Sequence, residues 1–251
     1  MQFSFQSNVV QVNTESTKAL FDAVTERFIA GEGFAIATVN LDHLVKMRNS
    51  DSFLTAYQKQ DFIVADGNPI VWLSRLAKRP VQLVPGSELV VPLAQLAAEN
   101  NVAIALLGST EEALQQAAKG LQNRIPDLTI ATCIAPPFGF DPTGVQAKEM
   151  LAALQDSGAG LCFLALGAPK QEEFAALGRE LAPNIGFVSI GAGLDFIAGN
   201  QTRAPRWVQN LALEWLWRML SSPRRLVPRY ARCIWILPSL ALEALKLSRR
   251  G

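Results

Sequence analysis

Polar residues that could bind a substrate and move a proton follow two apolar runs in the first third of the chain. Asp66 stands in the segment ADGNP, where a carboxylate could act as a general base toward a hydroxyl group. Thr38 and Asn40 belong to the segment TVN and offer side chains that can hydrogen-bond a polar ligand. Asp-Gly is also a common turn pair, so an ordinary capping role for Asp66 is the structural alternative.

Two later segments have the residues of a phosphate-binding site. Lys170 and Gln171 belong to LGAPKQEE, where an apolar run ends at Gly167 and a helix is expected to begin. Gly191 and Gly193 in GAGLDFIAG permit close approach of the backbone to a ligand. GAGLDF lacks the third glycine of a dinucleotide fingerprint, and a lone lysine is often only solvated. The residues alone therefore predict a nucleotide-type ligand and nothing narrower.

The elements that must position these residues alternate between apolar runs and amphipathic segments. Six nearly continuous apolar runs predict strands covered on both faces: 34–40, 62–66, 102–108, 128–134, 161–167 and 185–191. Start and stop signals predict helices over 17–30, 87–100 and 110–124. This alternation predicts an α/β fold, a Rossmann-like parallel sheet flanked by helices. Ligands of such sheets bind at the carboxyl ends of the strands, where all four polar segments lie.

The last fifth of the chain has a different charge. Residues 1–202 hold 13 Lys and Arg against 20 Asp and Glu, whereas residues 203–251 hold 10 against 2. We therefore divide the chain into an α/β core (1–202) and a basic helical appendage (203–251). Prolines are expected to cut the appendage into short helices, at Pro205, Pro223, Pro228 and Pro238. Four of the five tryptophans also lie there, and with the apolar stretch 233–242 they favour an anionic membrane surface over nucleic acid as the partner.

The composition disfavours several chemistries. His43 is the only histidine, which argues against histidine-dependent triads and His-rich metal sites, and we expect it on a helix surface or at a rim. The chain has neither a GxxxxGK[ST] loop nor the Asp-x-Asp that clamps a metal against a sugar nucleotide. Its three separate cysteines fit a reducing cytosol, and we expect neither a signal peptide nor a membrane span. No metal and no cofactor are therefore expected, and arginines are the candidates to stabilise a leaving diphosphate.

Six segments, in order, resemble the WecB/TagA/CpsF family of bacterial glycosyltransferases, glycosyltransferase family 26. They are TVN, ADGNPIVW, LLGSTEEALQQAAKGLQNRIPDLTI with PPFGF after it, LALGAPKQEEF, GAGLDFIAG and RAPRWVQNLALEWLWRMLSSPRRLVPRY. The resemblance implies an inverting, metal-independent enzyme that moves a sugar from a UDP-sugar to an undecaprenyl-diphosphate-linked sugar in surface polysaccharide synthesis. It also implies a cytoplasmic enzyme, peripheral on the inner face of the plasma membrane, whose basic appendage meets the lipid.

The resemblance further implies roles for individual residues. Asp66 matches the general base, and Thr38 and Asn40 match residues of the acceptor pocket. The residues implied to bind the donor lie at or after the ends of the later strands: Gly108, Lys170, Gln171, Gly191, Gly193 and Asp195. Arginines of the appendage are implied to bind the diphosphate, and their individual roles stay open: Arg218, Arg224, Arg225 and Arg229.

One position departs from the family pattern. Where many members have an arginine in RVTG, this chain reads QLVPGSEL, with Leu83 at that place. Either Arg79 compensates or the enzyme uses a different sugar, so N-acetylmannosamine, glucose and a uronic acid all stay open as the donor sugar. A non-catalytic membrane-associated subunit of a polysaccharide assembly is the alternative function. A Rossmann-type oxidoreductase is disfavoured because the dinucleotide fingerprint is absent.

Overall fold

A parallel β-sheet forms the centre of the protein. The computed structural model describes the whole chain except residues 6–7, 201–204, 206–213, 222 and 250–251. Six strands pair in parallel in the order β4-β3-β8-β7-β5-β6. They are β3 (Phe34–Val39), β4 (Phe62–Ala65), β5 (Ile104–Gly108), β6 (Ile130–Ile134), β7 (Leu161–Ala165) and β8 (Gly186–Ser189). The six predicted strands are confirmed, each to within two residues at either end.

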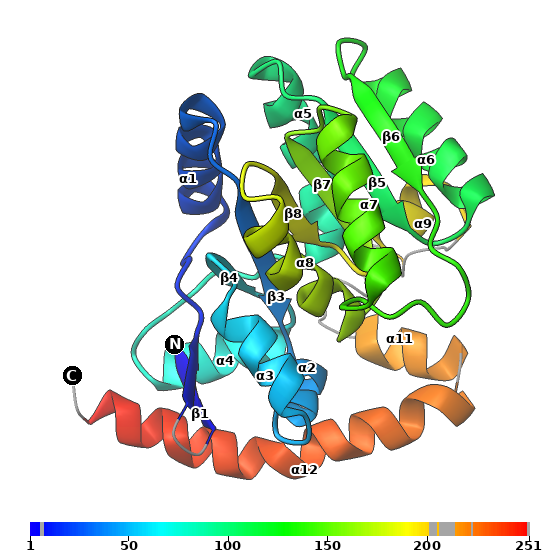
Figure 1. Ribbon diagram of the computed structural model, residues 1–251. Helices are drawn as coiled ribbons and strands as arrows, with labels where there is room; N and C mark the ends of the chain where they lie inside the picture. The colour runs from blue at the N-terminus through cyan, green and yellow to red at the C-terminus, as the bar shows by residue number, and fades with distance from the viewer. Residues whose placement is uncertain (6–7, 201–204, 206–213, 222, 250–251) are drawn as a thin grey trace.

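Helices cover both faces of this sheet (Figure 1). One face packs against α1 (Thr17–Ala30), α5 (Gly86–Glu99), α6 (Glu111–Arg124) and the short α9 (Gly193–Ile197). The other packs against α2 (Leu41–Met47), α3 (Asp51–Gln58), α7 (Val145–Asp156) and α8 (Lys170–Leu181). In β3, Phe34 and Ile36 enter the first layer whereas Ala35 and Ala37 enter the second, because successive side chains of a strand alternate. The Rossmann-like α/β architecture is thus confirmed.

The helix boundaries follow the capping signals of the sequence. The Ser16 side chain accepts a hydrogen bond from the Ala19 N–H at the start of α1, and Gly31 ends that helix at φ 67°. Thr110 caps α6 in the same way. The antiparallel hairpin of β1 (Gln2–Phe5) and β2 (Asn8–Gln11) was not predicted. Its Phe3 and Val10 are buried in a core cluster that includes residues of the C-terminal helix, so its stability depends on a distant part of the chain.

The C-terminal part ends in one long helix, α12 (Pro223–Ser248), which runs along the lower side of the molecule in Figure 1. The prediction of short helices cut by prolines is wrong here, because Pro228 and Pro238 both lie inside this 26-residue helix. Packing against α2 and α4 buries Cys233, Ile236 and Leu240. This burial stabilises the helix enough to offset the backbone hydrogen bonds that proline cannot make.

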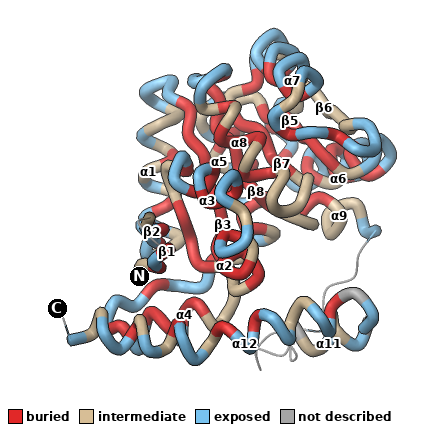
Figure 2. Tube along the Cα trace, turned by 60° about the horizontal axis from the view of Figure 1, so that its bottom comes forward, coloured by how far each residue is buried: buried red, intermediate tan, exposed pale blue. Residues whose placement is uncertain are grey.

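Two shorter helices accompany α12. They are α4 (Asn68–Leu76) and α11 (Glu214–Ser221), and both contact it. Figure 2 shows buried and exposed residues alternating along α12, as expected for a helix with one face on a core and the other toward solvent. Within the described part of the chain, no helix combines the length and the apolar character that a membrane span requires.

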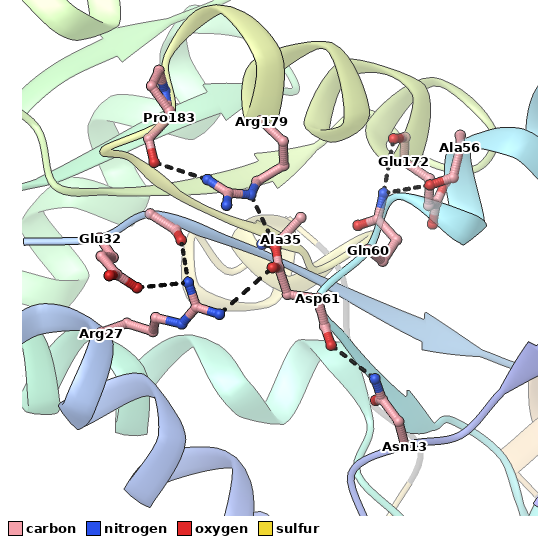
Figure 3. A network of polar contacts seen from close by, with 11 residues as sticks. Asn13, Arg27, Glu32, Ala35, Ala56, Gln60, Asp61, Glu172, Arg179 and Pro183 are labelled. Atoms are coloured by element: carbon pink, nitrogen blue, oxygen red, sulfur yellow. Dashed lines mark hydrogen bonds and ion pairs between the residues drawn. The ribbon is translucent and has the colours of Figure 1, made fainter. Parts of the chain in front are cut away.

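An ion-pair network joins the sheet to α1 and α8 at the amino ends of β3 and β4 (Figure 3). Asp61 accepts hydrogen bonds from the Ala35 N–H at 2.8 Å and from Arg179 Nε at 2.9 Å. Arg27 Nη2 lies 3.8 Å from the other carboxylate oxygen. Because the network lies at the edge of the sheet opposite the strand carboxyl ends, it stabilises the core and takes no part in the site described below.

Candidate active site

The carboxyl edge of the sheet has an arrangement that is suited to ligand binding. After β3 the chain enters α2 on one face of the sheet, whereas after the neighbouring β8 it enters α9 on the other. The neighbours β7 and β5 diverge in the same manner, toward α8 and α6. In open parallel sheets, ligands bind where adjacent strands send their connections to opposite faces. The predicted site residues lie at these strand ends and at the end of β4.

Asp66 and Asn40 lie together at the ends of β4 and β3. The Asp66 N–H donates to the Val39 carbonyl at 2.8 Å, and Asn40 Nδ2 lies 3.5 Å from Asp66 Oδ2. The Asn40 side-chain oxygen caps α2 by accepting from the His43 N–H at 3.1 Å, which fixes the orientation of its amide. Gly67 has φ 115°, a conformation that turns the chain into α4 and leaves the half-buried carboxylate at the strand end. This placement suits a general base.

Thr38 is buried directly beneath this pair. Its carbonyl oxygen accepts a hydrogen bond from the Tyr57 hydroxyl at 2.6 Å, and His43 Nδ1 lies 2.7 Å from the same oxygen. A Cβ atom placed on Gly86 would lie 3.1 Å from Thr38 Cγ2, so the N-terminus of α5 packs closely against the strand end. Thr38 is only 4% exposed, and it lies at the strand end where the acceptor side is predicted.

The expectation that His43 lies on a helix surface or at a rim is wrong. It belongs to α2, but it is 6% exposed and its ring packs edge-on against Phe53. Burial lowers the pKa of His43 from 6.5 to about 4, with nearby Lys46 acting in the same direction. The ring is therefore neutral at pH 7 and holds the end of β3 in place.

Gln171 joins two strand ends on the predicted donor side. It is 2% exposed, its amide oxygen accepts from the Gly191 N–H at 3.1 Å, and its amide nitrogen donates to Glu172 Oε1 at 2.8 Å. Glu172 is fully buried, and burial raises its pKa from 4.5 to about 7. Gln171 thus fixes the loop after β8. The sequence analysis assigned no role to Glu172. Two adjacent polar residues, Gln171 and Glu172, at the start of a helix that packs on the sheet were the signal that could have identified it.

Gly108 and Asp195 come together at the next strand end. The Ser109 hydroxyl donates to Asp195 Oδ1 at 2.7 Å, which links the end of β5 to α9. A Cβ on Gly108 would lie 2.4 Å from the Ala165 carbonyl oxygen, so β5 and β7 approach closely only with glycine here. Gly193 is buried and packs against Val90 of α5, so the packing of α9 already requires a small residue there.

Lys170 lies in the first turn of α8, as predicted, and its amine contacts a neighbouring loop. Lys170 Nζ donates to the Phe140 carbonyl at 2.7 Å, which ties the segment after β6 to the N-terminus of α8. Phe138 in that segment is fully exposed at the same edge of the sheet. The lysine therefore positions a loop beside the predicted donor side.

The four predicted arginines differ in how the structure places them. Arg229 Nη2 lies 3.0 Å from Asp42 Oδ2, and Lys46 Nζ lies 3.0 Å from the same oxygen. This cluster of Arg229, Asp42 and Lys46 joins α12 to α2. Its Asp42 stands two residues after Asn40 in the chain. Arg224 is exposed in the first turn of α12. The side chains of Arg218 and Arg225 lie outside the described residues. In the described residues, no group of three His, Cys, Asp or Glu side chains is placed to hold a metal ion.

Comparison with known proteins shows the family of the chain. Residues 7–250 match the family described as glycosyl transferase WecG/TagA/CpsF. The chain belongs to this family. A transferase of Bacillus subtilis (strain 168), named N-acetylglucosaminyldiphosphoundecaprenol N-acetyl-beta-D-mannosaminyltransferase, is 27% identical over 92% of this chain and 90% of its own length. A protein of the same name from Bacillus spizizenii is 25% identical over 89% of this chain and 87% of its own.

Family membership over nearly the whole chain identifies the type of reaction. A WecG/TagA/CpsF glycosyltransferase must hold a hydroxyl acceptor near a base and a nucleotide sugar near groups that stabilise its diphosphate. The two groups of predicted residues, around Asn40 and Asp66 and around Gly108, Gln171 and Gly191, lie at strand ends of one edge of the sheet. The protein is a hexosyltransferase, and the resemblance found in the sequence is confirmed.

Proposed function

We propose that this glycosyltransferase moves a sugar from a UDP-sugar to an undecaprenyl-diphosphate-linked sugar, with inversion at the anomeric carbon and without a metal ion. The Asn40–Asp66 pair at the ends of β3 and β4 is the observation that carries the proposal. The family match and the acceptor named in the titles of both Bacillus relatives support the choice of a lipid-linked acceptor.

The transfer is a single displacement. A hydroxyl oxygen of the acceptor sugar attacks the anomeric carbon, and the bond from that carbon to the nucleotide diphosphate breaks as the new bond forms. The diphosphate leaves with the electron pair, and the hydroxyl proton passes to the Asp66 carboxylate. General-base help of this kind contributes roughly 10²–10⁴ in rate. Attack from the face opposite the leaving group inverts the configuration.

The donor binds across the loops after β8 and β5. Gly191 has φ 57° and is itself half-buried. Its N–H donates a hydrogen bond to Gln171, which holds this part of the loop in place. The N-terminus of α8 adds the first-turn N–H groups that favour anions. Asp195 and Ser109 join β5 to α9 and thereby set the width of this region.

Arginines of the appendage stabilise the leaving diphosphate. Arg224 and Arg232 are exposed on α12, and Arg229 is partly exposed at the contact with α2. Guanidinium groups form paired hydrogen bonds with phosphate oxygens and keep their charge at any relevant pH. Asp42 already neutralises part of the Arg229 charge, so Arg224 and Arg232 are the better placed of the described arginines.

The appendage binds the cytoplasmic face of the membrane. Nine of the fifteen large apolar side chains that the described residues expose lie on α4, α11 and α12: Trp72, Leu76, Trp217, Leu220, Val227, Ile234, Trp235, Leu242 and Leu245. Exposed apolar side chains beside basic residues are typical of helices that lie in the interface of an anionic bilayer. An acceptor anchored in the membrane requires such a position.

The donor sugar is N-acetylmannosamine, glucose or a uronic acid. Leu83 forms an isolated bridge with Ala65, next to Asp66, and its side chain is 39% exposed. An apolar side chain at this place offers no charge to a uronic acid, so the first two sugars fit the surroundings of Asp66 better.

The test is transfer by purified protein. Lipid-diphosphate N-acetylglucosamine and other lipid-diphosphate sugars are incubated with a panel of nucleotide sugars, and products are identified by mass spectrometry. One productive UDP-sugar is expected, with the new linkage inverted. Absence of transfer with every pair, by a folded protein in vesicles, would instead support a non-catalytic subunit of an assembly complex.

A further inference from the structure

An apolar groove runs between α4 and α12. It has a volume of about 300 Å³ and is lined by Pro69, Trp72, Leu73, Leu76, Leu237, Pro238 and Ala241. The α4 residues recur at helical spacing, so they form one stripe along the helix. The stripe from Pro69 to Leu76 covers about 10 Å of the helix axis. Trp72 is 54% exposed and Leu76 is 39% exposed, so apolar surface remains uncovered in the groove.

One end of the groove adjoins the proposed acceptor side. A Cβ atom placed on Gly67 would lie 3.8 Å from Pro69 Cδ and 3.8 Å from Asn40 Cβ. Gly67 follows Asp66 directly, so the first lining residue of the groove and the Asn40–Asp66 pair are neighbours in space. The apolar lining of the groove therefore begins close to the place proposed for the acceptor sugar.

The polarity of α12 changes along its length. The described basic residues of its first half are Arg224, Arg229 and Arg232. The groove residues Leu237, Pro238 and Ala241 follow, and Arg232 precedes Leu237 by about 8 Å along the helix axis. A polyprenyl diphosphate has the same order of an anionic group followed by a hydrocarbon chain.

We propose that this groove binds the first isoprene units of the lipid acceptor. The proposal rests on the proposed function, because it extends the acceptor side from the sugar to the lipid. Apolar walls without a charged side chain suit a branched hydrocarbon, and each buried CH₂ group contributes about 0.8 kcal/mol in transfer from water. The groove thus selects acceptors by their chain and holds the attached sugar against Asp66.

The direct test is calorimetric binding of farnesyl diphosphate, a soluble molecule with the same two parts. Wild-type protein should bind it at least about 10-fold more tightly than inorganic diphosphate, since burying even two CH₂ groups accounts for that factor. Leu76→Asp should remove most of this difference and leave the binding of inorganic diphosphate unchanged.

Leu245→Asp is the matched control. Leu245 is 40% exposed on α12 outside the groove, so its substitution changes the same residue type at the same exposure. It should bind farnesyl diphosphate as the wild type does. Equal affinity for the two ligands in wild type, or equal losses in both variants, would overturn the proposal. A dimer in sedimentation that only Leu76→Asp dissociates, without farnesyl diphosphate binding, would assign the groove to a second copy of the chain.

A second experiment measures transfer in detergent, without vesicles. Acceptors carrying the same diphosphate sugar on a short alkyl chain or on a polyprenyl chain are compared by kcat/KM. Wild type should prefer the polyprenyl acceptor, whereas Leu76→Asp should lose at least about 10-fold with it and stay within about twofold with the short one. Equal effects on both acceptors would refute chain binding. Failure of the proposed function is distinguishable, because wild type would then use neither acceptor.

Discussion

At the scale of single residues, Asp66 and Asp61 differ in position, which separates the proposed base from a structural carboxylate. Both stand at the ends of β4, one after its last residue and one before its first. Asp61 lies within a network with Arg27 and Arg179, whereas Asp66 is half-buried at the open end of the strand beside Asn40. The two aspartates therefore provide a matched pair of variants.

We expect Asp66→Asn to keep the fold and to lower kcat by about 10²-fold or more with little change in KM, because an amide cannot accept the proton. Asp61→Asn should instead lower the free energy of unfolding and leave kcat of the folded protein close to normal. Steady-state kinetics and urea unfolding on both variants separate the two roles. Near-normal turnover of Asp66→Asn would remove this residue from the mechanism.

Glu172 predicts a pH-dependent stability. Its pKa is raised from 4.5 to about 7 by burial, so the native state binds a proton that the unfolded state releases. The wild type should therefore lose stability as pH rises from about 4.5 through 7, by up to about 3 kcal/mol. His43, with its pKa lowered to about 4, has the opposite slope between about 4 and 6.5. The two effects partly cancel in the wild type.

Glu172→Gln should expose the effect of the carboxylate. Urea unfolding of variant and wild type between pH 4.5 and 8 gives a difference in which the His43 contribution cancels. The variant should gain stability relative to wild type as pH rises through 7, and the difference should level off above it. A difference that is constant over this range would mean that Glu172 ionises in the native state as it does in the unfolded chain.

At the scale of elements, α12 has a structural and a surface role. Cys233, Ile236 and Leu240 of this helix are buried with β1, β2, α2 and α4, and Arg229 pairs with Asp42. Deletion after Gly199 would therefore destabilise the body as well as remove the proposed membrane contact. Substitutions on the exposed face of the helix, measured by vesicle binding, test the membrane contact without removing the buried packing of α12.

We expect Arg224→Ala and Arg232→Ala each to weaken binding to anionic vesicles by on the order of fivefold at low salt, from about 1 kcal/mol for each basic residue. The effect should shrink as salt rises, because screening reduces the attraction. Vesicle sedimentation measures both. Trp235→Glu, at a site 87% exposed, should weaken binding even at high salt, whereas Ile29→Glu on α1, 78% exposed, should have no effect. Equal losses with Trp235→Glu and Ile29→Glu would contradict binding through α12.

At the scale of the whole molecule, the charge is divided between an acidic core and a basic appendage. The proposed site lies where the two meet, since Arg229 of α12 contacts Asp42 next to the strand ends. We propose that this charge draws an anionic nucleotide sugar to the appendage side of the sheet, where arginines would take the place of a metal ion at the leaving diphosphate.

We expect transfer activity to persist in excess EDTA. The chain lacks the Asp-x-Asp pair that clamps a metal against a sugar nucleotide, and the exposed arginines supply the required charge. Turnover with and without chelator is the measurement. Complete loss on chelation, with recovery after addition of Mg²⁺ or Mn²⁺, would show that a metal stabilises the diphosphate.

Local patterns in the sequence determined the sheet and the helices α1, α5 and α6. The strands could be predicted because burial on both faces demands continuous apolar runs, and α1 and α6 because Ser16 and Thr110 cap them. Asp66 could be selected as a candidate because the carboxyl ends of parallel strands share one edge, whereas its role as the base was implied by the family resemblance. The strands, the helices and the candidate residues need only neighbouring residues and the general rules of α/β folds.

Tertiary structure decided what depends on residues far apart in the chain. The pairing of Arg229 with Asp42, the burial of His43 and the groove between α4 and α12 all require contacts that no local pattern encodes. Pro228 and Pro238 show the same limit of local patterns. The geometry of proline predicts a break in the helix, whereas the burial that keeps α12 continuous depends on distant residues. Packing energy summed over a long interface outweighs the preference of a single residue, and only the folded chain shows where that interface lies.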